Sequence, residues 1–142
     1  KIKALKKTAL SYGLIKKTVS KNSTNVEKLF FDLFKDNAKI INDYNMKIST
    51  SSDVNYLYYI IKQYSNLIIS NDNEKDFEKN IPKYLFREKD FLIRLFRNYG
   101  SAKKKLLINL LLKSEIAIKQ NSQLSFLVGL RMLLSFKKIS IS

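Results

Sequence analysis

The acidic residues are the side chains of this sequence best suited to chemistry, because the 142-residue chain has no histidine and no cysteine. Without histidine the commonest general base is missing, and without cysteine there is neither a thiolate nucleophile nor a zinc–sulfur site. Paired carboxylates could still act as general acid and general base. The densest acidic stretch is NDNEKDFEKN, which contains Asp72, Glu74, Asp76 and Glu78.

This acidic stretch lacks the surroundings that catalysis or metal binding requires. Its carboxylates alternate with Asn and Lys, and no apolar segment beside them would shift a pKa. A calcium-binding loop also needs a central glycine and a terminal bidentate glutamate. The three glycines of the chain are scattered and cannot form a phosphate-binding loop. We interpret the stretch as a solvated loop and expect a non-catalytic domain with no cofactor and no metal.

Glu115 is a different kind of acid, because it lies inside the largely apolar stretch LLLKSEIAIKQNSQLSFL. Lys119 follows four residues later, which is the favourable orientation for an ion pair on a helix. The pair is either a charged edge of the fold or a polar anchor for a neighbouring helix or subunit. The residues alone leave both interpretations open, and Glu115 and Lys119 are therefore candidate interface residues.

The basic residues favour a negatively charged partner. The chain carries 27 basic and 12 acidic residues, a formal charge of +15, and such an excess is typical of proteins that bind nucleic acid or another polyanion. However, 23 of the basic residues are Lys, as an AT-rich genome would give at permissive surface positions. Direct nucleic-acid binding is therefore the alternative function. Its candidate residues are Arg94, Arg97, Lys103, Lys104, Lys105 and Arg131.

The elements that position these residues are expected to be helices. One proline and three glycines are too few for a β-protein built on tight turns. Apolar residues recur at helical spacing along most of the chain. The sequence predicts an all-α helical bundle of about six helices in residues 22–142, preceded by a tail and linker at residues 1–21. The expected helices are residues 22–34, 36–48, 53–70, 83–100, 101–120 and 122–136.

Particular residues make these expectations specific. Thr24 and Glu27 have the spacing of a capping box at the start of the first helix. Gly100 suits the left-handed conformation that often ends a helix. The helix at 101–120 is apolar nearly all round, which predicts a position in the middle of the bundle. Gly129 lies within the last helix, where glycine costs about 1 kcal/mol against alanine, and it therefore predicts a close approach by a neighbour.

Several aromatic residues exceed what one core stripe can hold. The tyrosines of the helix at 53–70 could stack on the bases of single-stranded nucleic acid. At helical spacing they more often form the edge of a core with the phenol reaching water, and we favour that interpretation. An assembly domain would use such an excess as a contact surface. The aromatic residues concerned are Tyr56, Tyr58, Tyr59, Phe77, Tyr84 and Phe86.

The sequence offers no signal for a membrane or a secretory location. No apolar run reaches the 18 or more residues of a membrane span. The basic N-terminal segment lacks a long apolar region and a cleavage site. We expect a cytoplasmic protein without a membrane partner, and we expect the chain to be the C-terminal part of something longer.

The segment LLLKSEIAIKQNSQLSFLVGLRMLL resembles the end of the delta subunit of the bacterial replicative clamp loader, part of DNA polymerase III. In that family an apolar run, an acidic residue and a short alanine–aliphatic–lysine segment end the last long helix. The corresponding residues here are Leu110–Leu112, Glu115 and Ala117–Lys119. A short polar turn and a Leu-rich helix then follow, here Leu124–Phe136.

The resemblance extends upstream in the same order. NIPKYLFREKDFLIRLFRNYG is similar to the family's segment in which a proline and aromatic and basic residues precede the penultimate long helix pair. STSSDVNYLYYIIKQYSNLI is similar to a helix that follows a loop of small residues, and LIKKTVSKNSTNVEKLFFDLFKDN resembles the junction with the middle domain. The resemblance covers about residues 15–136, with a looser match near residues 36–50.

The resemblance implies a function in DNA replication. In this family the C-terminal domain is an all-α collar that packs beside the collars of the other loader subunits in a circular pentameric assembly. Its partners would be the gamma/tau motor subunits and delta-prime, with contact to DNA through the complex. The nucleotide-hydrolysing motor belongs to other subunits, and clamp opening belongs to an N-terminal domain. This chain would accordingly be a non-catalytic assembly domain.

Overall fold

The computed structural model describes residues 25–120 and 122–141, with the backbone alone at residue 122. Every regular element in these ranges is a helix, which confirms the predicted all-α fold. A helical segment at residues 25–31 precedes six α-helices, α2 to α7. The predicted tail at residues 1–21 and Thr24 of the predicted capping box lie outside the described residues.

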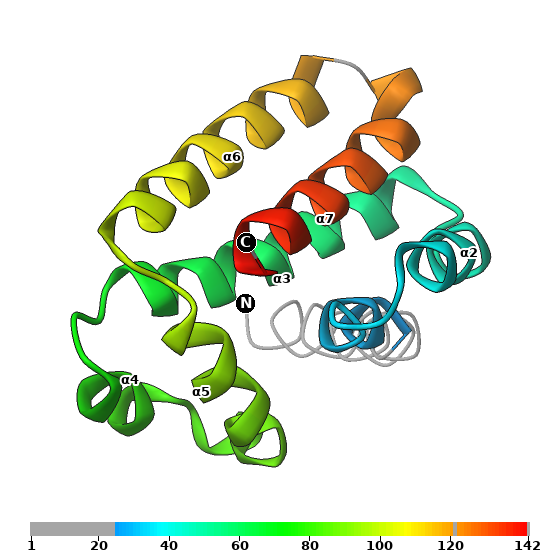
Figure 1. Ribbon diagram of the computed structural model, residues 1–142. Coiled ribbons are helices and arrows are strands. Elements are labelled where there is room, and N and C mark those ends of the chain that lie inside the picture. The colour runs from blue at the N-terminus through cyan, green and yellow to red at the C-terminus, as the bar shows by residue number, and fades with distance from the viewer. Residues whose placement is uncertain (1–24, 121, 142) are drawn as a thin grey trace, which may run out of the picture.

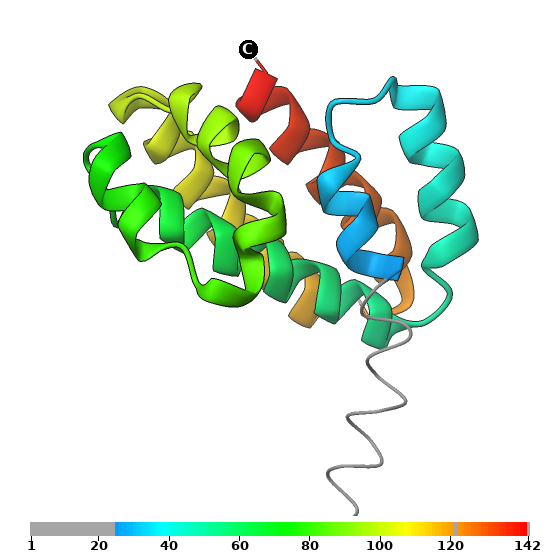
Figure 2. The same ribbon diagram turned by 90° about the horizontal axis from the view of Figure 1, so that it is seen from below.

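The helical segment 25–31 and α2 (Asn37–Lys47) lie side by side at one end of the bundle (Figure 2). Asp36 caps α2, since its carboxylate accepts a hydrogen bond from the backbone N–H of Lys39 at 2.8 Å. Ile40 and Tyr44 are buried as expected, and both therefore anchor α2 on the core.

Helix α3 (Ser51–Ile69) is the central helix of the bundle. Thr50 caps it in a capping box, because the Thr50 hydroxyl accepts from the N–H of Asp53 and the Asp53 carboxylate accepts from the N–H of Thr50. The helix begins at Ser51, two residues before the start of the predicted range 53–70. It packs against α4, α6 and α7, and in Figure 1 it runs behind α7.

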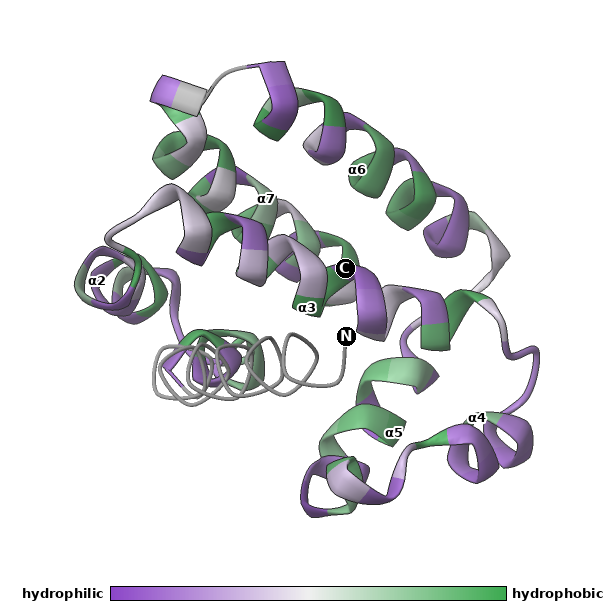
Figure 3. Ribbon diagram, turned by 180° about the vertical axis from the view of Figure 1, so that it is seen from behind, coloured by the Kyte–Doolittle hydropathy of each residue, from purple (hydrophilic) through white to green (hydrophobic). Residues whose placement is uncertain are grey.

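The predicted loop at residues 71–80 is wrong, because most of it forms the short helix α4 (Glu74–Asn80). Asn73 caps α4 by accepting a hydrogen bond from the N–H of Asp76 at 2.8 Å. Phe77 is completely buried and its ring stacks on that of Phe96, with centroids 4.4 Å apart. One buried aromatic residue in a polar stretch thus anchors the helix. A single apolar residue forms no periodic pattern, so periodicity could not predict α4. Figure 3 shows how hydrophilic the rest of α4 is.

The single helix predicted at residues 83–100 is divided in two. A 3-10 helix, η1 (Lys83–Glu88), follows Pro82 and leads into α5 (Lys89–Arg97). Phe86, at the end of the 3-10 helix, faces solvent, and 54% of its surface is exposed. The residues of α5 that are buried are Leu92, Leu95 and Phe96.

Helices α6 (Ser101–Gln120) and α7 (Ser125–Ile141) form a hairpin that lies across α3, with the short 3-10 helix η2 (Ser122–Leu124) between them (Figure 1). The prediction that residues 101–120 lie in the middle of the bundle is wrong. Only Leu107, Leu111 and Ser114 of α6 are buried. Because α3 and α7 cover only part of α6, its other sides face solvent.

The two described glycines differ in their surroundings. No glycine has a positive φ among the described residues, so the predicted left-handed conformation of Gly100 is wrong. Gly100 instead precedes α6 and its carbonyl accepts from the N–H of Lys104 at 3.0 Å. The predicted close approach at Gly129 is confirmed: a Cβ there would collide with the Tyr44 hydroxyl and lie 3.1 Å from Val54.

Aromatic residues join distant parts of the chain in the core. Phe30 stacks on Tyr64 with centroids 4.3 Å apart, and its ring lies 5.5 Å from that of Phe136. These contacts connect the first helical segment, α3 and α7. A buried hydrogen bond of 2.6 Å between Tyr99 and Ser140 fixes the end of α7 beside the end of α5. The inner side of α7 is therefore held along its whole length.

Candidate protein interface

The outer side of α6 presents large apolar residues to solvent. Leu112 and Ile116 expose 55% and 54% of their surfaces, and Ile108 exposes 40%. These three residues are spaced four apart, so they lie along one side of the helix. We call them the α6 outer stripe. A row of exposed aliphatic residues on one helix is the kind of surface that protein partners cover.

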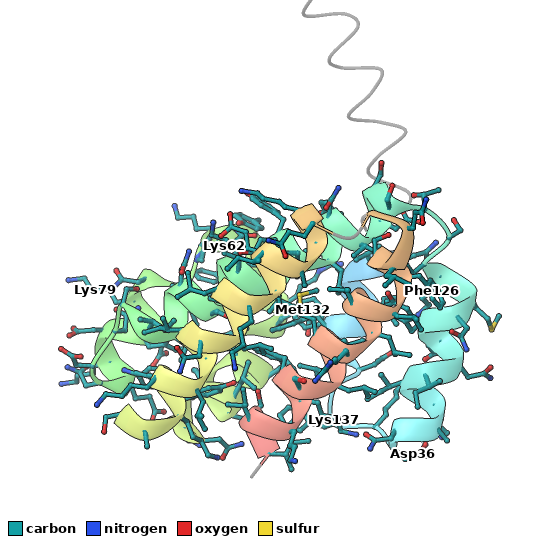
Figure 4. All side chains as sticks on the ribbon, turned by 90° about the horizontal axis from the view of Figure 1, so that it is seen from above. Asp36, Lys62, Lys79, Phe126, Met132 and Lys137 are labelled. Atoms are coloured by element: carbon teal, nitrogen blue, oxygen red, sulfur yellow. The ribbon has the colours of Figure 1, made fainter. Side chains whose placement is uncertain are left out.

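A groove runs between α6 and α7 on a different side of the hairpin, with a volume of about 480 Å³. Leu110 lines it, whereas Leu112 of the α6 outer stripe does not. Counting 100° per residue, the stripe and the α6 residues of the groove are centred about 130° apart around α6, so they form two separate sides of the helix. Met132 lies between the two helices in Figure 4. The groove is lined by Leu106, Asn109, Leu110, Lys113, Ser114, Ala117, Val128, Arg131, Met132, Ser135 and Ile139.

Helix α7 has an apolar outer side next to this groove. Leu127 is 60% exposed and Ile141 is 49% exposed, while Leu130 and Leu134 are half-buried. We call these four residues the α7 outer stripe. Two further hollows along the stripe are lined by Leu130 and Leu134 and by Leu134 and Ile141. In Figure 4, α7 lies between α6 and α2.

The predicted ion pair between Glu115 and Lys119 is present, at 3.2 Å, beside the α6 outer stripe. The hydrogen bond from Lys119 holds the pKa of the Glu115 carboxyl below its usual value, and the positive charge of Lys62 on α3 adds to this effect. Burial raises the pKa of Tyr58 in turn, and the Glu115 charge raises it further. Glu115 is therefore ionised at neutral pH, and its environment is that of a surface ion pair.

The three lysines at the start of α6 have different environments. Lys104 donates a hydrogen bond of 2.7 Å to the carbonyl of Asn71, and its ammonium lies 5.6 Å from the centre of the Phe96 ring. This contact joins the start of α6 to the segment that follows α3, which gives Lys104 a structural role. Lys103 is half-buried and Lys105 is exposed.

The three candidate arginines also have separate surroundings. The Arg94 guanidinium lies over the Phe34 ring, 4.7 Å from its centre. Phe34 itself is 37% exposed. Arg97 pairs with Glu74 on α4 at 2.6 Å, and its hydrogen bond lowers the pKa of that carboxyl. Arg131 lines the α6–α7 groove.

The acidic stretch contributes to structure at α4. Asp76 accepts a hydrogen bond from the side-chain amide of Asn73 at 2.9 Å. Glu78 forms an ion pair of 2.7 Å with Lys89 at the start of α5. Within residues 25–120 and 122–141, no group of three or more His, Cys, Asp or Glu side chains could hold a metal ion. No helix in the same ranges is both long and apolar enough to cross a membrane.

The aromatic residues that the sequence assigned to a contact surface are divided between core and surface. Phe77 is in the core, and Tyr56 and Tyr58 are half-buried. Tyr59 and Tyr84 are exposed, as is Phe86. The Tyr84 hydroxyl accepts a hydrogen bond from Gln63 at 2.6 Å, which connects η1 to α3. Only part of this set is therefore available to a partner.

The α7 outer stripe was missed by the sequence-based reasoning. Leu124 and Leu127 lie in the helix predicted at residues 122–136, and both are more than half exposed. A signal was nevertheless present, because Leu127, Leu134 and Ile141 recur every seven residues. Such a repeat on a helix that already has a complete buried side indicates a second apolar side.

Comparisons of this chain with protein-family models, with curated proteins and with solved structures found no match in any of the three. The functional interpretation therefore depends on the residues and surfaces described above.

Proposed function

We propose that this chain is an assembly module, the C-terminal collar domain of a delta-type subunit of a DNA polymerase III clamp loader. The observation that carries the proposal is the apolar surface that α6 and α7 leave uncovered. The largest contributions to it come from Leu112, Ile116 and Leu127, each more than half exposed. Full burial of one such side chain is worth about 1.5–3 kcal/mol, so a partner that covers several of them gains substantial free energy.

The arrangement of these surfaces supports assembly with more than one neighbour. The α6 outer stripe and the α6–α7 groove lie on separate sides of α6. A subunit inside a ring contacts one neighbour on each side, and two separate apolar surfaces suit that requirement. The resemblance in sequence names the neighbours as the gamma/tau motor subunits and delta-prime.

The acidic residues also support a binding role over a catalytic one. Glu74, Glu78 and Glu115 each form an ion pair with a basic side chain. These carboxylates are at least one-third exposed, and the hydrogen bonds from Arg97 and Lys119 lower the pKa values of Glu74 and Glu115. A general acid at neutral pH would need the opposite environment, one that raises its pKa.

Co-elution tests the proposal directly. The chain is mixed at micromolar concentration with the motor subunits and delta-prime, and the mixture is separated by size exclusion. We expect one complex, which the double variant Leu112→Ser/Leu127→Ser weakens by at least about tenfold through loss of apolar contact. Met46→Ser is the matched control, because Met46 is 77% exposed on α2 and belongs to neither stripe.

Separate elution of the wild-type chain and the loader subunits at micromolar concentration would overturn the proposal. Binding to oligonucleotides is measured alongside, since the charge of +15 is the observation that favours the nucleic-acid alternative. The alternative would be supported by DNA binding without any co-elution, provided that the DNA affinity falls as salt is added. The expected slope of log affinity against log salt concentration is about one unit per phosphate contacted.

A further inference from the structure

We infer that the α7 outer stripe binds an amphipathic helix of a partner protein whose apolar residues are flanked by carboxylates. This inference rests on the proposed function, because it assigns the stripe to an assembly partner. It adds the secondary structure and the charge of the segment that docks there. The shape of the stripe, the charges beside it and the composition of α7 each contribute to it.

The spacing of the stripe favours a helical partner. Leu127, Leu134 and Ile141 are seven residues apart, and Leu130 follows Leu127 by three. Apolar residues at spacings of three and seven form the seam of a coiled coil, in which a second helix inserts its side chains between them. The hollows along the stripe share Leu134, so they are continuous along α7. A second helix would follow this line between α6 and α2 (Figure 4).

The charges beside the stripe favour an acidic partner. Arg131 and Lys138 each lie four residues after an apolar residue of the seam, the position from which coiled coils form interhelical ion pairs. Lys113 adds a third cation from the opposite wall of the groove. None of the residues that line the groove and the two hollows is acidic. Carboxylates on the partner would therefore meet only opposite charges.

The cations Arg131 and Lys138 are available for such a partner. The side chain of neither residue forms a hydrogen bond or an ion pair with any of the residues that the structure describes. The adjacent Lys137 differs, because it donates hydrogen bonds to the carbonyl of Lys35 and to the side chain of Asn37. Figure 4 shows Lys137 directed toward the start of α2. Lys137 thus holds the fold together, whereas its neighbour Lys138 faces outward.

A second copy of this chain is a poor occupant of the stripe. Helix α7 contains no Asp or Glu between Ser125 and Ile141, so a second α7 would bring further cations and no carboxylate. A nucleic acid would neutralise Arg131 and Lys138 but would leave the leucines of the seam in water. An acidic amphipathic helix satisfies both the apolar and the charged parts of the surface.

Three labelled helical peptides of about 21 residues, or three heptads, test the inference by fluorescence anisotropy with the whole chain. The first has Leu at the seam positions and Glu at the flanking positions. The second has Lys in place of Glu, and the third has Ser in place of Leu. We expect saturable binding of the Leu/Glu peptide, at least about tenfold tighter than binding of either of the others.

Charge reversal locates the binding site. In Arg131→Glu/Lys138→Glu we expect the preference to invert, so that the Leu/Lys peptide binds more tightly than the Leu/Glu peptide. Lys75→Glu/Lys79→Glu is the matched control, with the same change of charge on two exposed positions of α4. Unfolding monitored by circular dichroism verifies that both variants keep the fold.

Four results would overturn the inference. They are equal binding of the Leu/Glu and Leu/Lys peptides, equal binding of the Leu/Glu and Ser/Glu peptides, no saturation at about 100 µM, and complete displacement by an oligonucleotide. Co-elution with the loader subunits that survives Arg131→Glu/Lys138→Glu, without peptide binding, would reject this inference and retain the proposed function. Peptide binding without any co-elution would do the reverse.

Discussion

The inner and outer sides of α7 are both apolar, yet only the inner side is buried. On the inner side, Phe136 is in contact with Phe30, and Gly129 lies against Tyr44. On the outer side, Leu127 and Ile141 lie about half or more in water. The difference shows that hydrophobicity alone does not bury a side chain. Burial also requires a neighbour of matching shape, and within the described chain only one side of α7 has such neighbours.

Helix α6 shows the same division. Leu107 and Leu111 pack on the core. Their neighbours in the sequence, Leu106 and Leu112, are more than half exposed. By contrast, α5 separates its residues cleanly, with buried leucines on one side and Arg94 and Arg97 on the other. A helix of the α5 kind is complete within one chain, whereas a helix of the α6 kind has apolar surface left for a partner.

The strongest test of the comparison is Phe136→Ala against Leu134→Ala. Phe136 is fully buried, so its loss leaves a cavity and should lower the free energy of unfolding by about 3–5 kcal/mol. Leu134, two residues away on the outer side, should cost less than half of that. Urea unfolding followed by circular dichroism gives both values. Equal losses would mean that the outer side is as well packed as the inner one.

A loss of that size could unfold the chain completely, given that small domains are stable by only about 5–15 kcal/mol. Phe136→Leu provides a milder variant at the same position. It should fall between the wild type and Phe136→Ala, and it keeps the comparison with Leu134→Ala measurable.

Alkaline pH should weaken the inner side through Tyr99. Burial raises the pKa of this phenol to about 12, whereas it is near 10 in the unfolded chain. The unfolded state therefore loses its proton first, and the stabilisation is complete below pH 10 and disappears as pH rises from 10 to 12. A shift of this size corresponds to about 2–3 kcal/mol.

The Tyr99→Phe variant isolates this contribution. It lacks the hydrogen bond to Ser140 at every pH, so it should be less stable than the wild type at neutral pH. The difference should shrink between pH 10 and pH 12, as measured by urea unfolding at a series of pH values. A difference that stays constant over that range would show that the Tyr99 phenol is not protected by burial.

Gly129→Ala should disturb the inner side by a smaller amount. The added methyl group collides with the Tyr44 hydroxyl, which donates a hydrogen bond of 2.6 Å to the carbonyl of Phe126. We expect a net loss of about 1–3 kcal/mol in the free energy of unfolding, despite the better helix propensity of alanine. Adding Tyr44→Phe removes the nearest atom, so the double variant should lose less than the sum of the single variants.

Gly100→Ala is the control for this prediction. Nothing lies within 4 Å of a Cβ placed at Gly100, and the free energy of unfolding should change by no more than about 1 kcal/mol. A destabilisation at Gly100 equal to that at Gly129 would contradict the steric explanation.

The smallest expected effect on folding is that of Glu115→Leu. The ion pair with Lys119 is exposed, so its loss should leave the thermal midpoint unchanged within error. The variant extends the apolar surface beside the α6 outer stripe, and we expect it to alter association with the loader subunits. Loss of cooperative unfolding in this variant would show that Glu115 is structural.

The sequence predicted best where local chemistry and tertiary packing agree. The predicted ion pair of Glu115 with Lys119 is present, and its two residues are only four apart on one helix. Prediction from the sequence failed at α4. This helix is held by the stacking of Phe77 on Phe96, which belongs to another helix. Prediction also failed at the α7 outer stripe, since periodicity identifies apolar sides but not which of two such sides is covered.

The amino-acid sequence by itself determined the all-α fold and the main helices. It also excluded sites that depend on histidine, on cysteine or on a glycine-rich loop. Those properties follow from composition, capping and the 3.6-residue period, which act over a few residues. Only the tertiary structure decided that α3 is central, that Gly129 lies against Tyr44, and that α6 and α7 leave apolar sides uncovered. The physical reason is that an apolar residue favours any apolar neighbour, and the neighbour it obtains depends on the packing of the whole chain.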